Sequence, residues 1–330
     1  MNAMLRTLKL LPSRLVVLSF LFVLSAADAN AGGRYAILVG ASNYLAIEPL
    51  HNPINDVTAV ARSLEEAAFT VEIVLDPTSL EATDRLLSFL RGVFEESQST
   101  EIEALLFFFA GHGVQHRGEN FLLPVDFSMP LLQSGGAEDY LSRLETALWE
   151  NTFNINNLVD SFNVIEADSY IFIFDACRTS PFDGVVLSDG LSEVVAGPDN
   201  YIVFSAAPGR AALDGSGANS PFSQSLAARI PFQGMPIEVM MQGVRRDVYR
   251  ETDGYQLPWD ASSLMHPFSF IPLGAFGERE PLEDVSEQES QLWEFVVQSG
   301  FTAQALRRYL IIFPNGRHAD AARLRLEGLE

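Results

Sequence analysis

The first two-thirds of the chain alternates short apolar runs with segments whose apolar residues recur at helical spacing. Residues 35–39, 105–109 and 170–174 are apolar without alternation, which is typical of strands buried on both faces of a sheet. The same pattern predicts further strands at 70–75 and 201–204, a hairpin strand at 121–125, a last short strand at 268–271, and helices at 55–68, 80–94, 154–164, 220–228 and 237–252. Residues 127–153 are expected to be irregular. Strands separated by helices predict an α/β fold, with a mostly parallel sheet covered on both faces by helices.

The pattern changes after Gly274. Residues 278–289 are acidic and loop-like, and the apolar positions that follow them predict short amphipathic helices. We therefore expect a main domain at 32–275 and an acidic linker with a small α-helical appendage at 276–330. The appendage resembles half of a helical repeat, and its helices are candidates for contact with a protein partner.

The N-terminal segment has the pattern of a targeting sequence. Basic residues at Arg6, Lys9 and Arg14 precede an apolar stretch at 15–26, and residues 29–31 supply a small-x-small cleavage pattern. The apolar stretch is shorter than the ~20 residues of a relaxed membrane span. We expect residues 1–31 to be a signal peptide cleaved after Ala31, which predicts a periplasmic or secreted protein without stable membrane association. An uncleaved anchor is the alternative.

The net charge of −22 restricts the partners of the protein. Binding to nucleic acid or to anionic lipid needs clustered Lys and Arg, and the composition argues against both. A basic peptide or protein would be attracted to such a chain. The sequence has a single cysteine, Cys177, so an intramolecular disulfide is impossible. Taken alone, such a residue is more often a buried core thiol than a reactive one.

Polar residues follow three of the predicted strands. His112 comes after the third strand, Cys177 after the fourth, and Asp56 beyond the first. In a parallel sheet these positions share one edge, where ligands bind. A thiol attacks an amide only as a thiolate, so Cys177 needs a base such as His112 within reach. The backbone N–H groups of Gly113 and Cys177 are candidates for an oxyanion hole.

The segment 175–179 (Asp-Ala-Cys-Arg-Thr), which follows His112 by 65 residues, resembles the caspase signature. The blocks at 40–44, 50–56, 205–209 and 219–222 add to this resemblance, which spans about residues 34–272. The chain most resembles the metacaspase, paracaspase and bacterial caspase-like branches of the caspase fold group. The resemblance implies a caspase-like sheet and a cysteine endopeptidase with His112 and Cys177 as its catalytic dyad.

The departure from true caspases concerns substrate preference. Caspases have Gln two residues before the catalytic Cys, where this chain has Asp175. In the metacaspases and paracaspases that the chain resembles, residues matching Asp56 and Asp175 form an acidic pocket, which implies cleavage after Arg or Lys, with Arg preferred. Asp214 is a candidate third carboxylate. Alternatively, Asp56 is a charge at a helix N-terminus and Asp175 caps a strand end.

No organic cofactor is implied. A metal site is not expected either, because His112 and His116 lie among glycines that oppose a helical zinc pair. The alternative function is a non-catalytic interaction protein on a caspase-like scaffold. Residues 179–200 contain no Lys or Arg, so an enzyme specific for basic residues should not cut itself there. Any self-cleavage is expected elsewhere, for example at Arg143 or Arg279.

Overall fold

The computed structural model describes residues 32–130, 136–177, 194, 197–207, 210, 212–273, 285–298, 301–313 and 316–329. The predicted signal peptide with its cleavage site after Ala31, residue Arg178, most of the segment 179–200 and the acidic linker with Arg279 lie outside the described residues.

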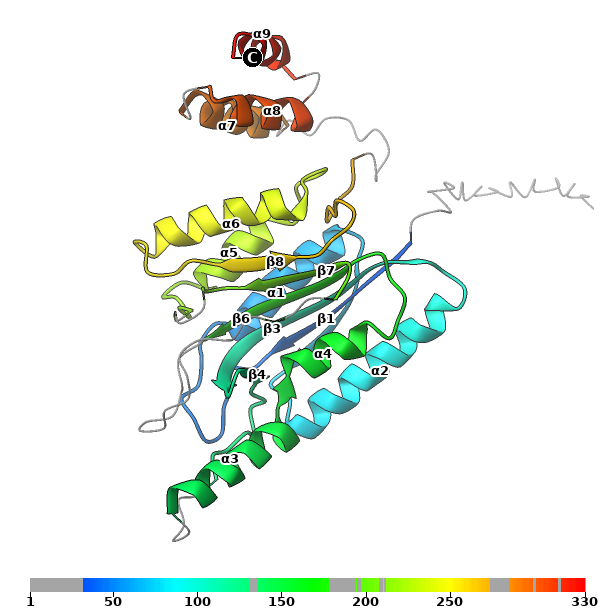
Figure 1. Ribbon diagram of the computed structural model, residues 1–330, viewed down its shortest axis with the longest axis vertical. Coiled ribbons are helices and arrows are strands. Elements are labelled where there is room, and N and C mark those ends of the chain that lie inside the picture. The colour runs from blue at the N-terminus through cyan, green and yellow to red at the C-terminus, as the bar shows by residue number, and fades with distance from the viewer. Residues whose placement is uncertain are drawn as a thin grey trace, which may run out of the picture. The chain divides into compact units, whose positions relative to one another are not determined.

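The described chain begins with alternating strands and helices and ends in three consecutive helices (Figure 1). The strands are β1 (Gly33–Gly40), β2 (Thr70–Leu75), β3 (Ile102–His116), β4 (Glu119–Leu122), β5 (Phe153–Asn154), β6 (Tyr170–Cys177), β7 (Asn200–Phe204) and β8 (Trp259–Ser262). The helices are α1 (Pro53–Glu66), α2 (Ser79–Ser97), α3 (Gly136–Asn151), α4 (Ile155–Phe162), α5 (Pro221–Arg229), α6 (Ile237–Glu251), α7 (Val285–Gln298), α8 (Ala303–Ile312) and α9 (Ala319–Glu327).

The main sheet has the order β2-β1-β3-β6-β7-β8, and all its neighbours are parallel except β7 and β8. Helices α1, α5 and α6 cover one face, and α2 and α4 cover the other (Figure 1). Alternate residues of β3 supply the two cores: Phe107 and Phe109 face α4, whereas Leu106 and Phe108 face α1. The predicted α/β fold, with helices on both faces of a mostly parallel sheet, is confirmed.

Strand β3 is longer than its apolar run. It pairs in parallel with β6 up to the pair His112–Cys177, and residues 113–116 then pair antiparallel with β4. His112 therefore lies inside a strand, where the chain passes from one ladder to the next, and Cys177 is the last residue of β6. The expectation that both residues follow their strands is wrong by a few positions, because strand geometry continues past the last large apolar side chain.

The expectation that residues 127–153 are irregular is wrong for residues 136–151, which form α3. Tyr140, Leu144 and Leu148 recur every four residues, and the two leucines are fully buried. The helical spacing is present in the sequence, but the many polar residues around these positions obscure it.

The predicted strand at 268–271 is also wrong. These residues form only isolated bridges, and their apolar character reflects the burial of Phe268 and Phe270 in the core that α6 contributes to. The last strand is β8, an edge strand with one neighbour, whose half-exposed residues lack an apolar run.

Helix α1 begins at Pro53, with Asn52 at its N-cap position, rather than at Asn55. Helices α7 to α9 have a core of their own, built around Val296, Leu306, Tyr309 and Ala322. Among the described residues, no helix combines the length and the apolar character that a membrane span needs.

Candidate active site

His112 is held by the segment that follows β1. Its side chain is buried, and its Nε2 lies 2.9 Å from the main-chain oxygen of Glu48. Because a carbonyl only accepts, this contact places the proton on Nε2 and leaves a lone pair on Nδ1. Nδ1 is buried and has no hydrogen-bond partner within the described chain. Burial lowers the pKa of His112, and the contact with Glu48 opposes that shift only in part. The imidazole is therefore a neutral base at neutral pH, with Nδ1 as its accepting atom.

The strand register places Cys177 beside His112. The two residues are Cα partners at the end of the β3–β6 ladder, and the side chain of Cys177 lies outside what the structure describes. Side chains of paired residues on neighbouring strands stand on the same face of the sheet. The backbone thus brings the predicted nucleophile and base together.

The amide of Gly113 falls on the side of β3 where Cys177 lies. Leu105 donates from its N–H to the oxygen of Ser169, the residue before β6. Every second N–H of a strand points toward the same neighbouring strand, so the N–H of Gly113, like that of Leu105, points toward β6. The ladder with β4 gives the same direction. Leu123 donates from its N–H to the oxygen of His112, so Gly113 and Leu122, the next pair along, do not exchange hydrogen bonds in that ladder. The Gly113 N–H therefore points away from β4. The Gly113 N–H is therefore directed toward the end of β6.

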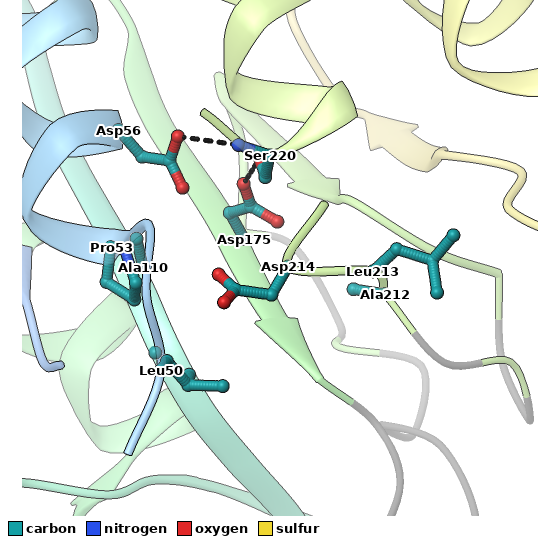
Figure 2. Close-up of a pocket in the computed structure, with 10 residues that line it drawn as sticks. Leu50, Pro53, Asp56, Ala110, Asp175, Ala212, Leu213, Asp214 and Ser220 are labelled. Atoms are coloured by element: carbon teal, nitrogen blue, oxygen red, sulfur yellow. Dashed lines mark hydrogen bonds between the residues drawn. The ribbon is translucent and has the colours of Figure 1, made fainter. Parts of the chain in front are cut away.

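A small pocket, partly open to solvent, lies beside this strand end. The carboxyl groups of Asp56, Asp175 and Asp214 converge in it from three separate parts of the chain (Figure 2). The remaining lining residues are largely small or apolar, and they are Leu50, Pro53, Ala110, Gly111, Ala212, Leu213 and Ser220. Carboxyl groups surrounded by apolar walls suit a ligand with an aliphatic stem and a cationic head.

Asp56 and Asp175 are both buried. Oδ1 of Asp56 accepts hydrogen bonds from Asn219 Nδ2 and from the Ser220 N–H, each at 2.9 Å. Asp175 Oδ2 accepts from the Ser220 hydroxyl and, at 2.6 Å, from the Ser223 hydroxyl. These partners are neutral, so they compensate the burial of two acidic groups only partly.

The pKa values of both groups reflect this environment. Burial, followed by the nearby Asp175 charge, raises the pKa of Asp56 to about 8. Burial also raises the pKa of Asp175, against the effect of its serine hydrogen bonds. A cation entering the pocket would stabilise the ionised form of both carboxyl groups.

Asp214 differs from the other two because it is tied to the start of α1. Its carboxylate accepts from the main-chain N–H of His51 at 2.8 Å and from that of Asn52 at 3.1 Å. It therefore lines the pocket and also anchors the segment before α1. Within the described part of the chain, no three His, Cys, Asp or Glu side chains form a group able to hold a metal ion.

Sequence reasoning missed four contributors to the site: Tyr44, the Glu48 carbonyl, Asn219 and Ser220. Tyr44 packs on the His112 ring, with ring centroids 4.6 Å apart. Ser220 followed by proline was a recognisable helix N-cap, and its side chain does accept from the Ser223 N–H. Its contact with Asp175 depends on tertiary structure and leaves no sequence signal.

Comparisons with known proteins agree with this architecture. The family model described as "Caspase domain" matches residues 33–269. A stretch of 152 residues, 45% of this chain, is 29% identical to the mucosa-associated lymphoid tissue lymphoma translocation protein 1 of Homo sapiens, and its Mus musculus homologue is 28% identical over the same length. The match spans only 15% of these relatives. The crystal structure of caspase-1 from Spodoptera frugiperda superposes with a TM-score of 0.52 at 17% identity, covering 78% of this chain and 94% of that one, which supports the fold alone.

Proposed function

Because this chain belongs to the caspase-domain family of cysteine peptidases, we propose that it is a cysteine endopeptidase that cleaves peptide bonds after arginine. Cys177 is the nucleophile and His112 the general base. The observation that carries the proposal is the register of β3 and β6, which pairs His112 with Cys177 while Asp175, two residues earlier, lines an acidic pocket.

The proton transfers follow from the environment of His112. Nδ1 takes the thiol proton of Cys177, and the thiolate attacks the scissile carbonyl. The N–H groups of Gly113 and Cys177 stabilise the resulting oxyanion. The imidazolium then gives its proton to the leaving amine, and water hydrolyses the remaining thioester. The hydrogen bond from Nε2 to Glu48 keeps Nδ1 as the transferring atom throughout.

The pocket supports a basic side chain before the scissile bond. A guanidinium presents several donors in a plane and can satisfy Asp56 and Asp175 together, whereas a lysine ammonium offers a single charge centre. An aspartate in the same place would face acidic groups and would find no positive charge to pair with. We therefore expect Arg to be preferred over Lys at this position, and Asp to be rejected.

The test is cleavage of a matched set of peptides that differ only in Arg, Lys, Leu or Asp before the scissile bond. The Arg peptide should be cut fastest and the Asp peptide not at all. Cys177→Ala and His112→Ala should each reduce kcat by about three orders of magnitude or more. Cleavage by Cys177→Ala at the rate of the unmodified protein would exclude the proposed nucleophile.

A covalent probe separates this proposal from a non-catalytic scaffold. An arginine-containing chloromethyl ketone should label Cys177, and prior occupation of the pocket by a small guanidinium compound should slow the labelling. Absence of both labelling and cleavage would favour the scaffold.

The location of the enzyme is a separate proposal. We expect residues 1–31 to be removed and the mature chain to act outside the cytoplasm, on basic peptides or proteins. N-terminal sequencing of protein recovered after expression in a secreting host would show whether the mature chain begins at Gly32.

A further inference from the structure

The ladder between β3 and β4 is interrupted at His112. A hydrogen-bonded pair in an antiparallel ladder normally exchanges two bonds. Leu123 donates from its N–H to the oxygen of His112 at 2.9 Å. The reciprocal bond is replaced: the N–H of His112 donates to the Tyr44 hydroxyl at 2.7 Å, and that hydroxyl donates to the oxygen of Leu123 at 3.1 Å. A tyrosine hydroxyl is thus inserted between two strands at the residue that carries the base.

The same tyrosine contacts the imidazole. Its ring is buried and lies 4.6 Å from the His112 ring, at an angle of 53°. Four residues further along, the Glu48 oxygen accepts from Nε2 of His112. The segment 44–48 therefore positions the main chain of His112, orients its ring and selects its tautomer.

The surroundings of Tyr44 accommodate this insertion. A Cβ on Gly111 would lie 2.7 Å from the Tyr44 hydroxyl, so only glycine leaves room for the hydroxyl beside His112. The start of the segment is fixed by Asp76, whose Oδ1 accepts from the N–H groups of Ser42 at 2.7 Å and Asn43 at 3.0 Å. The tyrosine is therefore presented by a backbone that is itself held in place.

We propose that Tyr44 is a positioning residue for catalysis, which sets the location of the His112 imidazole relative to Cys177 by bridging His112 and Leu123. The inference rests on the proposed function only in taking His112 as the general base. Without the hydroxyl, His112 loses the partner of its N–H, and the strand end can relax into a direct bond with Leu123. That relaxation moves Nδ1 away from its position beside the β6 end.

The test is Tyr44→Phe, which keeps the ring and removes only the hydroxyl. Its matched control is Tyr170→Phe at the opposite end of β6. Tyr170 is also buried, and its hydroxyl also bridges the main chain, accepting from the Ala167 N–H at 3.1 Å and donating to the Ile165 oxygen at 2.6 Å. Both variants lose an equivalent pair of hydrogen bonds, so thermal unfolding should report similar losses of stability.

The two variants should differ in catalysis. Tyr44→Phe should lower kcat for the Arg peptide by roughly 10- to 100-fold, the usual effect of a small misplacement of a catalytic group, and leave KM within about twofold. It should also slow the alkylation of Cys177 by iodoacetamide near pH 6.5, because a displaced imidazole no longer favours the thiolate. Tyr170→Phe should match the unmodified protein in kcat and in alkylation rate.

Two results would overturn the inference: unchanged kcat and alkylation in Tyr44→Phe, or equal losses of kcat in both variants. If the unmodified protein cleaves no peptide, the proposed function fails. The alkylation comparison then still decides on Tyr44, because it needs only the Cys177 thiol and the His112 ring.

Discussion

Asp56 and Asp175 come from different elements and are held by the same residue, Ser220. The Ser220 N–H donates to Asp56 at 2.9 Å, and the Ser220 hydroxyl donates to Asp175 (Figure 2). The two carboxyl groups are therefore coupled both through their charges and through a shared partner. Neutralising one of them changes the charge state of the other, so the pocket is expected to respond to substrate and to pH as a unit.

Asp56→Asn should weaken the binding of Arg substrates. The Asn side chain can keep an oxygen as the acceptor for Asn219 and Ser220, so the pocket should stay intact while losing a carboxyl group that can ionise when a guanidinium binds. We expect kcat/KM for the Arg peptide to fall by the equivalent of about 1–3 kcal/mol, and the Leu peptide to change little. The control is Asp84→Asn, which removes the same charge from an exposed position on α2. Equal losses for the Arg and Leu peptides would contradict the assignment of Asp56 to the pocket.

The affinity for Arg substrates should depend on pH. Since the pKa of Asp56 in the empty pocket is raised to about 8, the group is largely protonated at neutral pH. A guanidinium needs the ionised form, so KM for the Arg peptide should fall as the pH rises toward 8, and the Leu peptide should show no such trend. Because the pKa of His112 is lowered, protonation of this general base occurs at a more acidic pH. Steady-state kinetics from pH 5.5 to 9 with both peptides would separate the two effects.

Asp56 should also reduce stability at high pH. Its pKa is higher in the folded protein than in the unfolded chain, so the folded state binds more protons between about pH 4 and pH 8. The free energy of unfolding should therefore fall as the pH rises through this range, with a limiting slope of about 1.4 kcal/mol per pH unit for one proton. Asp56→Asn should flatten this slope. Urea unfolding at pH 6 and pH 9 would measure it, and identical slopes in the two proteins would contradict the raised pKa.

The sequence predicted the sheet and the convergence of polar residues at its edge, because continuous apolar runs and the geometry of parallel strands are local and regular signals. It missed α3, whose leucines recur at helical spacing within a polar stretch, and β8, because an edge strand needs no apolar run. Tyr44 lies in the 40–44 block that contributes to the family resemblance, but nothing in the sequence indicates that it or the Glu48 carbonyl contacts His112. Their roles are the contact of the Tyr44 hydroxyl with the His112 N–H and that of the Glu48 oxygen with the His112 ring, and both exist only once β1 and β3 are adjacent.

Asp214 should act mainly as an anchor rather than as a third charge for the substrate. Its carboxylate accepts from the N–H groups of His51 and Asn52, at the end of the segment that carries Tyr44 and Glu48. Asp214→Ala should lower kcat for the Arg and Leu peptides alike, by roughly threefold to tenfold, the effect of about 1 kcal/mol. Asp214→Asn, whose single amide oxygen can accept from only one of these two N–H groups, should recover part of the loss. A rise in KM confined to the Arg peptide in both variants would instead make Asp214 a specificity carboxylate.

The peptidase domain should work as a single uncut chain. An enzyme with an acidic pocket requires Arg or Lys before the bond it cuts, and residues 179–200 contain neither. Arg143, one of the two sites suggested by the sequence, lies within α3 and pairs with Asp139 at 3.0 Å, so cleavage there would require the helix to unwind. Mass spectrometry of the unmodified protein beside Cys177→Ala, before and after assay, would detect any self-cleavage.

We expect both proteins to keep an intact segment from Gly32 to Leu273. A cut between Thr179 and Asn200 that depends on Cys177 and is needed for activity would contradict this prediction, and it would contradict the preference for basic residues as well, since no such residue is available there.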